Sequence, residues 1–279
     1  MKKHLFILST LILFVSCSCS EFAGAPVSKD FTVGHYTELE VHDAFDVTVS
    51  NAVTQVTVTA GENIMPKVVV EVVDNTLKIH LNGILLNNFG SDMKAVIPYN
   101  ADLTGVDLSG ASEFHSEYGL KGANVEVELS GASKFYCDVD AVDVDIDISG
   151  ASKFYGDILS GEIEMDLSGS SKINGKVVAG NLDLDMSGAS DATLEGEVGA
   201  LRMGLSGSSK IVKKVNGNRY ALGCESCEGE LSGASDAYIH CDGSIKVRLS
   251  GASKLRYTGN ANTTDSDTSG SSDIHHDVL

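Results

Sequence analysis

The feature that most constrains this chain is a four-residue motif, Ser-Gly-Ala/Ser-Ser, that recurs at nearly constant spacing. It begins nine times, at Ser109, Ser130, Ser149, Ser168, Ser187, Ser206, Ser232, Ser250 and Ser269. The successive intervals are 21, 19, 19, 19, 19, 26, 18 and 19 residues. A motif repeated at this spacing indicates a stack of similar structural units, each packed against its two neighbours.

Within each unit, the residues before the motif alternate between apolar and polar. In the segment Val142-Asp143-Val144-Asp145-Ile146-Asp147-Ile148, aliphatic and aspartate side chains take turns. A period of two predicts a strand with one buried and one solvent-facing side. The motif predicts a tight corner, because glycine accepts the backbone angles of a sharp bend and Ala or Ser is small enough to stack. A second short strand follows, as at Lys134-Phe135.

The composition agrees with a stack of thin layers. The 279 residues include 29 glycines and no tryptophan, and aromatic residues make up 6%. Helical repeats of similar length would show a period of 3.6 residues, which this sequence lacks. We therefore predict an all-β fold, a parallel β-helix (β-solenoid) with ~19-residue coils and a less regular N-terminal β cap.

Four segments are expected along the chain. Residues 1–17 are predicted to be a lipoprotein signal peptide with its lipobox, and residues 18–29 a short linker. Residues 30–100 are predicted to form the N-terminal β cap and first irregular coils, in which His42-Asp43-Ala44-Phe45 loosely echoes the corner motif. Residues 101–279 are predicted to form the solenoid. A separate small β domain is the alternative for the N-terminal part.

The start of the chain has the pattern of a targeting segment. Two early lysines precede an apolar run from Leu5 to Val15, which is too short to span a bilayer. The run ends Phe14-Val15-Ser16-Cys17, which resembles a bacterial lipobox. We expect Cys17 to carry a lipid and to anchor the protein to the outer membrane, at the cell surface or on the periplasmic face. An ordinary secretory peptide cleaved near Ser20 is the alternative.

The charge of the chain limits its partners. The formal net charge is −19 at pH 7, which repels nucleic acid and anionic lipid surfaces. Apart from the membrane that holds the lipid anchor, the expected partner is a glycan or a protein of the envelope or host. The sequence predicts no catalytic residue, no cofactor and no metal ligand.

Carboxylates recur two and four residues before the corner in the middle of the rod. Stacked carboxylates repel one another, and folding does not require them there. We therefore expect a contact face at Glu126, Glu128, Asp145, Asp147, Glu164, Asp166, Asp183 and Asp185. The alternatives are that these residues only keep a β-rod soluble, or that they bind calcium through carboxylate oxygens.

Residues of the corner are also expected to form columns. The first and last serine of each corner should form hydroxyl ladders in which each serine donates to the next coil. The position after the corner carries both signs of charge, which relieves repulsion between adjacent strands. It reads Glu113, Lys134, Lys153, Lys172, Asp191, Lys210, Asp236, Lys254 and Asp273.

Two of the four cysteines beyond the signal segment form a Cys-x-x-Cys motif, at Cys224 and Cys227. Export permits disulfides, so a disulfide between these two is one prediction. A pair of unreacted thiols is the other. A zinc site is weakly supported, because the motif lacks the second Cys-x-x-Cys or His pair that completes such sites.

Several short segments occur in an order that resembles the family called putative auto-transporter adhesin, head GIN domain. The resemblance spans roughly residues 30–275. Its motifs are Leu39–Val49, Gly61-Glu62-Asn63, Leu77-Lys78-Ile79, and Val96-Ile97-Pro98 leading into Leu108–Ser112. The resemblance implies a β-helical fold and an exported protein or lipoprotein of the Bacteroidetes. That family has no agreed catalytic residues, so it assigns none to this chain.

These observations favour a cell-envelope lipoprotein that acts as a non-enzymatic, adhesin-like binding or structural module through a rigid acidic β-helix. A periplasmic scaffold or sensor is the first alternative. A polysaccharide-active β-helix enzyme is a weaker one, because the carboxylates here are periodic, whereas a catalytic pair occupies one unique site.

Overall fold

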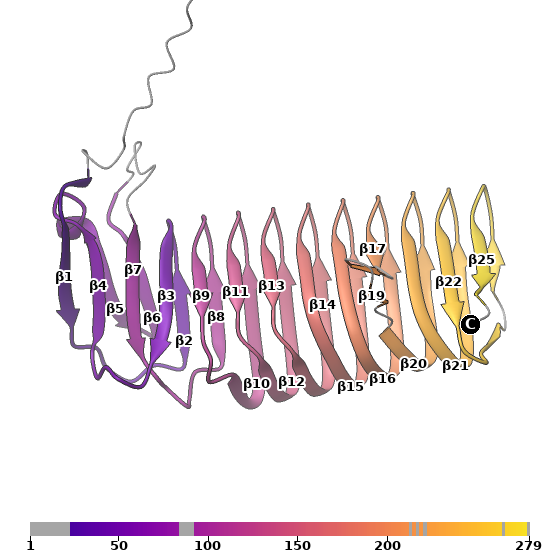
Figure 1. The fold of residues 1–279 in the computed structure, drawn as a ribbon, viewed down its shortest axis with the longest axis horizontal. Coiled ribbons are helices and arrows are strands. Elements are labelled where there is room, and N and C mark those ends of the chain that lie inside the picture. The colour runs from indigo at the N-terminus through magenta and orange to yellow at the C-terminus, as the bar shows by residue number, and fades with distance from the viewer. Residues whose placement is uncertain are drawn as a thin grey trace, which may run out of the picture.

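The computed structural model describes residues 23–83, 92–211, 214–215, 218–219, 222–263 and 266–277. These residues form an all-β chain that winds as a β-solenoid of about eight turns with ~19-residue coils (Figure 1). The predicted fold class is therefore confirmed. Within the described ranges, none of the helical structure is long and apolar enough to cross a membrane.

The N-terminal strands precede the regular repeats. They are β1 (Pro26–Phe31), β2 (Glu38–Val41), β3 (Phe45–Ser50), β4 (Val56–Gly61), β5 (Val68–Val73), β6 (Thr76–Leu81) and β7 (Met93–Pro98), with a short 3-10 helix, η1 (Met65–Lys67), before β5.

The repeats contain long strands that precede the corners and short strands that follow them, and in some coils the short strand continues into the next long one. They are β8 (Gly105–Leu108), β9 (Glu113–His115), β10 (Leu120–Leu129), β11 (Lys134–Tyr136), β12 (Val139–Ile148), β13 (Lys153–Tyr155), β14 (Ile158–Leu167), β15 (Lys172–Met186), β16 (Asp191–Leu205), β17 (Lys210–Ile211), β18 (Lys214–Val215), β19 (Asn218–Arg219), β20 (Leu222–Leu231), β21 (Asp236–Leu249), β22 (Lys254–Thr258), β23 (Asn262–Thr263), β24 (Asp267–Thr268) and β25 (Asp273–His276).

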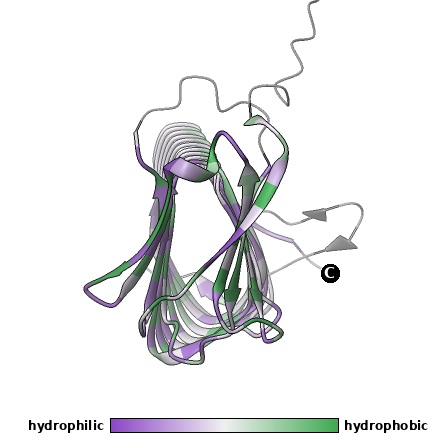
Figure 2. Cartoon of the chain, turned by 90° about the vertical axis from the view of Figure 1, so that its left-hand side faces the viewer, coloured by the Kyte–Doolittle hydropathy of each residue, from purple (hydrophilic) through white to green (hydrophobic). Residues whose placement is uncertain are grey.

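Consecutive coils pair in parallel, one repeat apart. Val144 of β12 is the Cα partner of Ile163 of β14, which is the partner of Leu182 of β15. Viewed from its N-terminal end, the stack shows each coil lying over the next (Figure 2). Because strands in a sheet lie about 4.8 Å apart, equivalent side chains of neighbouring coils are in direct contact.

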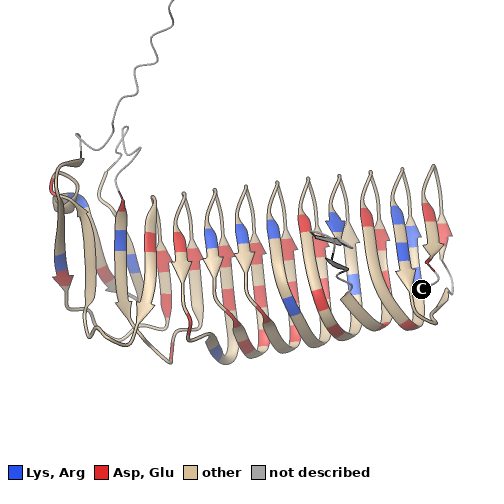
Figure 3. Cartoon of the chain, viewed as in Figure 1, with Lys and Arg blue, Asp and Glu red and all other residues tan. Residues whose placement is uncertain are grey.

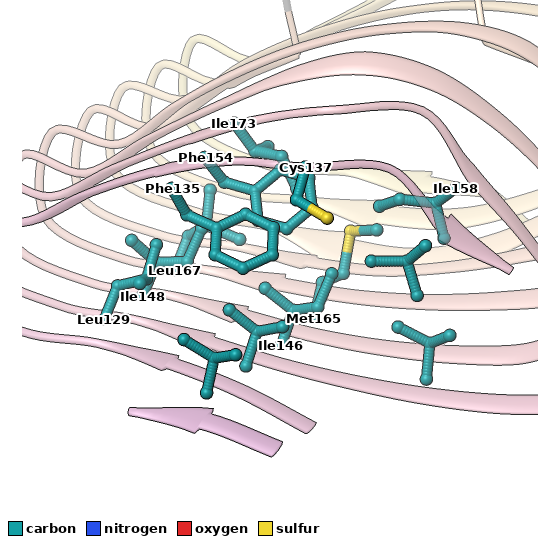
Figure 4. Close-up of a cluster of buried hydrophobic side chains, with 14 of the residues drawn as sticks. Leu129, Phe135, Cys137, Ile146, Ile148, Phe154, Ile158, Met165, Leu167 and Ile173 are labelled. Carbon is teal, nitrogen blue, oxygen red and sulfur yellow. The ribbon is translucent and has the colours of Figure 1, made fainter. Parts of the chain in front are cut away.

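The core consists of columns of equivalent apolar side chains (Figure 4). Phe114, Phe135 and Phe154 are fully buried and stack with ring centroids 5.3 and 4.8 Å apart. Facing them across the coil are Leu129 and Ile148, which are 2% and 1% exposed. Each coil buries few residues alone, so stability depends on contacts between neighbouring coils.

The corners depend on glycine. The nine corner glycines have φ between 71° and 75°, a region that L side chains rarely adopt. The earlier segment His42-Asp43-Ala44-Phe45 forms an equivalent corner, in which Asp43 takes the glycine position with a φ of 76°. The amide of Ala111 donates to the Asp43 carbonyl at 3.0 Å, as the amide of Ala132 donates to Gly110 at 2.7 Å.

The corner serines differ from the predicted hydroxyl ladders. The buried last serine mostly donates within its own corner, as when Ser133 Oγ donates to the Ser130 carbonyl at 2.7 Å. A direct bond between hydroxyls of successive corners joins Ser171 to Ser190 at 3.3 Å. In-register atoms of neighbouring coils are about 4.8 Å apart, whereas hydroxyl hydrogen bonds require about 2.8 Å. The nearer carbonyl is therefore the better acceptor.

The N-terminal strands continue the sheet of the solenoid and then change its direction. β2 pairs in parallel with β8, and β3 with β9. Beyond these, β4 runs antiparallel to β1 and β7, and β5 runs antiparallel to β6. These antiparallel strands cover the open edge that a parallel stack would otherwise expose at this end.

The 26-residue interval contains a lateral excursion. β18 and β19 form a separate antiparallel pair on the side of the rod (Figure 1). The chain rejoins the solenoid at β20, which pairs in parallel with β16. The next pairing, between β20 and β21, contains a register shift between Cys224 and Ser226.

Candidate functional site

The eight carboxylates predicted as a contact face lie on the outer side of four consecutive long strands. In β10, for example, Val127 and Leu129 point into the core while Glu126 and Glu128 are exposed. The residues form two in-register columns. We call this set the acidic face: Glu126, Asp145, Glu164 and Asp183 in one column, and Glu128, Asp147, Asp166 and Asp185 in the other.

Repulsion between neighbouring coils is visible in the carboxylate pKa values. The charge of Asp145 is the main cause that raises the pKa of Glu164, with partial desolvation and other carboxylates adding to it. Desolvation and then neighbouring carboxylates raise the pKa values of Asp147, Asp166 and Asp185. The folded protein therefore holds these negative charges together at a cost in stability.

A shallow groove of about 570 Å³ follows one column of the acidic face. Its polar lining includes this column and a further one, six residues before the corner, which the sequence prediction missed. That further column contains Asn124, Asp143, Glu162 and Asn181. The alternation of the strands places all three offsets on the same outer side, so six residues before the corner could have been included on the same argument.

The second column of the acidic face lies outside this groove. Asp166 and Asp185 line a different depression of about 460 Å³ beside the corner serines Ser168 and Ser187. Glu126 and Glu128 also line a third, smaller depression of about 200 Å³. The predicted face is thus one charged surface with several separate depressions. Figure 3 shows the carboxylates as rows of red across neighbouring strands.

Basic residues end the acidic face toward the C-terminus. Arg202 is the Cα partner of Asp183, and its guanidinium lies 3.9 Å from that carboxylate. Further along, Arg248 lies 3.3 Å from Glu230. Arg202 therefore interrupts the acidic columns, which carry Glu228 and Glu230 in the next coil before they turn basic at Lys246 and Arg248.

The short strands that follow the corners carry stacked aromatic rings and a column of residues of both charges. Tyr136 and Tyr155 stack on each other with ring centroids 5.0 Å apart, and His115 stacks on Tyr136 at 4.5 Å. The column after the corner carries the mixed signs noted in the sequence. Lys172, for example, donates to Asp191 of the next coil at 2.8 Å. These stacked ring faces contact one another, so only their edges are available to a ligand.

A polar cluster beside the corner at Ser109 joins Glu40 and His42 to Lys78 and Ser109, which are distant from them in sequence. His42 hydrogen-bonds to Ser109 and, at 2.5 Å, to Glu40, which also accepts from Lys78. Partial burial opposes ionisation of Glu40, yet the hydrogen bonds from Lys78 and His42 lower its pKa. The combination of Ser, His and Glu resembles a nucleophilic triad in composition, but Lys78 already neutralises Glu40. The cluster ties β2 and β6 to the corner at Ser109.

The cysteines of the solenoid are all buried, free thiols. Cys224, Cys227 and Cys241 lie in two successive coils, whereas Cys137 lies several coils away, in the turn before β12. The predicted disulfide of Cys224 with Cys227 stays a prediction. The predicted lipidation site, Cys17, lies outside the described residues.

Comparisons with known proteins extend the structural result. The chain matches the family model described as putative auto-transporter adhesin, head GIN domain, over residues 35–175 and again over residues 153–261. No curated protein matches the chain.

Solved structures with a similar fold come from the genus Parabacteroides. A putative adhesin from Parabacteroides merdae is 17% identical, with a TM-score of 0.65 over 91% of this chain and 97% of that one. A putative adhesin from Parabacteroides distasonis is 19% identical, with a TM-score of 0.64 over 91% and 98%. A putative lipid binding protein from the same species is 17% identical, with a TM-score of 0.63 over 91% and 97%.

At these identities the structural likeness supports the fold alone, whereas the family match covers most of the sequence. The chain belongs to the putative auto-transporter adhesin, head GIN domain family.

Proposed function

We propose that the protein is a lipid-anchored, non-enzymatic binding module of the cell envelope, which contacts a cationic protein segment through the acidic face. The observation that carries this proposal is the in-register stacking of like charges on four consecutive coils. Such stacking destabilises the fold. A partner that brings Lys or Arg side chains would relieve the repulsion.

The geometry favours a multivalent contact over a single strong site. Each coil presents the same carboxylates about 4.8 Å further along the rod, so an extended basic segment can meet several of them at once. Individually weak exposed ion pairs add up when they are linked on one rigid scaffold. Within the described residues, no three or more His, Cys, Asp or Glu side chains are grouped to hold a metal ion. The acidic face therefore acts as an extended electrostatic surface.

Binding of an oligolysine peptide, measured by calorimetry at low and high salt, tests the contact. A variant with Asp145→Asn, Glu164→Gln and Asp183→Asn removes three charges from the groove and should weaken binding at least tenfold. The matched control is a variant that neutralises three exposed carboxylates elsewhere, at Glu71, Asp102 and Glu195. It changes net charge equally and should retain most of the affinity. Equal loss in both variants would show only a net-charge effect and would contradict the proposed face.

The location of the module is tested on intact cells. Surface labelling and protease shaving should reach the protein, and Cys17→Ala should abolish its retention on the membrane. Labelling only after outer-membrane lysis would contradict the adhesin-like proposal and favour the periplasmic scaffold or sensor.

A further inference from the structure

Three buried thiols gather after the longest interval of the repeat, the 26 residues between Ser206 and Ser232. Cys224, Cys227 and Cys241 are 4%, 1% and 0% exposed. They follow the excursion of β18 and β19, at the point where β20 rejoins the stack. The register shift between Cys224 and Ser226 lies within the same cluster.

The pairing of coils brings two of these cysteines directly opposite each other. Cys224 of β20 and Cys241 of β21 are Cα partners in the parallel ladder. Neighbouring strands are about 4.8 Å apart, which lies within the Cα separation of about 4.4–6.8 Å that a disulfide needs. Each thiol also reaches the coil of the other, because Cys224 Sγ donates to the His240 carbonyl at 3.5 Å and Cys241 Sγ donates to the Glu225 carbonyl at 3.8 Å.

Cys227 is the competing partner. It lies three residues from Cys224 in the same strand, and its Cα partner in β21 is Ile245. Residues three apart in a regular strand point to opposite faces, yet Cys224 and Cys227 are both buried, so a disulfide within the motif depends on the irregular stretch between Cys224 and Ser226. A bond to Cys241 requires only the ladder that is already present.

We propose that Cys224 and Cys241 form a disulfide that joins two successive coils beside the excursion. The inference rests on the exported location in the proposed function, since an oxidising compartment is where such bonds persist. It revises the pairing within the Cys-x-x-Cys motif and leaves Cys227 as a free thiol.

The oxidant is a protein that carries a reactive disulfide. The Cys224 thiolate attacks that disulfide and forms a mixed disulfide, releasing one oxidant thiolate. The Cys241 thiolate then attacks the Cys224 sulfur, and the second oxidant thiolate leaves. Two cysteine protons pass to solvent, and the oxidant gains the two electrons.

The bond must form before the coils close. In the folded protein, the interaction with the Cys227 thiol is the main cause that raises the pKa of Cys224 to about 12, and burial adds to it. The thiolate needed for exchange is therefore scarce in the folded core. Folded, reduced protein should accordingly resist oxidised glutathione, whereas refolding protein should react.

Peptide mapping decides the pairing independently of where the protein resides in the cell. The chain from Ser20 onward, which contains every described residue, is reduced, unfolded and refolded with oxidised glutathione, and remaining thiols are alkylated. Cleavage after glutamate separates the three cysteines, because Glu225 follows Cys224 and Glu228 follows Cys227. The expected product is the Cys224 peptide linked to the Cys241 peptide, with Cys227 alkylated.

A link between Cys224 and Cys227, or alkylation of all three after oxidative refolding, would overturn the proposal. Cys227→Ser should retain the bond, and Cys241→Ser should leave Cys224 alkylated. Reduction should lower Tm by roughly 5–10 °C. Cys137→Ser, in a distant coil, is the matched control and should preserve both the link and its effect on Tm.

Discussion

The main-chain carbonyl of Gly110 lies 2.4 Å from the point where Gly131 would carry a Cβ. The same approach recurs at each later corner, where the preceding corner's carbonyl closes the space. Two constraints therefore act together at these positions, a positive φ and direct contact with the backbone of the preceding coil. Backbone cannot move aside without breaking the ladder, so glycine is required there for both reasons.

Gly150→Ala should destabilise the protein by about 2–4 kcal/mol, because it combines a strained φ with a backbone clash. A Cβ at this position would meet the Gly131 carbonyl at 2.4 Å. Gly34→Ala is the matched control, since nothing lies within 4 Å of its Cβ position. Denaturant unfolding measures both. Similar stability in the two variants would contradict the role assigned to the corner.

Ser190→Ala should cost about 0.5–1.5 kcal/mol, the usual value for a hydrogen bond lost at a buried site. The Ser190 hydroxyl is fully buried and donates to the Ser187 carbonyl at 2.7 Å. Ser187 is the first serine of the same corner and is exposed, so Ser187→Ala should change the free energy of unfolding far less. The reverse order would show that the inward hydroxyl is dispensable.

Phe135→Ala should cost about 3–5 kcal/mol, because it opens a cavity between two stacked rings. Phe135 is fully buried between Phe114 and Phe154. Leu159→Ala removes an apolar side chain that is 52% exposed and should have little effect. Thermal unfolding of both variants tests whether the aromatic column stabilises the central coils.

The acidic face should make the protein more stable in mildly acidic solution than at neutral pH. Its raised carboxylate pKa values mean that the folded state binds protons before the unfolded state as pH falls. As pH falls, the gain in stability should begin above pH 4, because ordinary carboxylate pKa values are about 4. At lower pH, protonation of Glu40 and Glu113, whose pKa values are lowered in the fold, should reverse it. A Tm that only decreases from pH 7 downward would contradict this account.

Glu164→Gln should raise Tm at pH 7 and low salt by roughly 1–3 °C, since it relieves repulsion with its neighbours. The gain should shrink in high salt, which screens exposed charges. Glu195→Gln provides the control, because Glu195 is an exposed carboxylate outside the acidic face. A gain that is the same for both variants would assign the effect to net charge.

Much of this structure could be predicted because the chain repeats itself. The period places Val144 beside Ile163 and Leu182, and the alternation decides which side of each strand carries carboxylates. Even the irregular corner at Asp43 was detectable, since a short motif with a turn-forming residue resembled its later copies. Parallel pairing of near-identical units leaves one register in which every apolar residue is buried.

The repeat pattern could not predict contacts that depend on the three-dimensional path of the chain within each coil. Most buried corner serines donate to a carbonyl of their own corner, and some also reach a carbonyl of the preceding coil, because equivalent hydroxyls are separated by a full strand spacing. The groove follows only one column of the acidic face. Its position depends on the sizes of the surrounding side chains, which the repeat pattern does not specify. Cys224 lies opposite Cys241 because β20 and β21 pair in parallel, and the ladder becomes irregular only after this pair. Sequence periodicity thus determined the fold and its faces, whereas coil closure in three dimensions decided which polar groups and thiols meet.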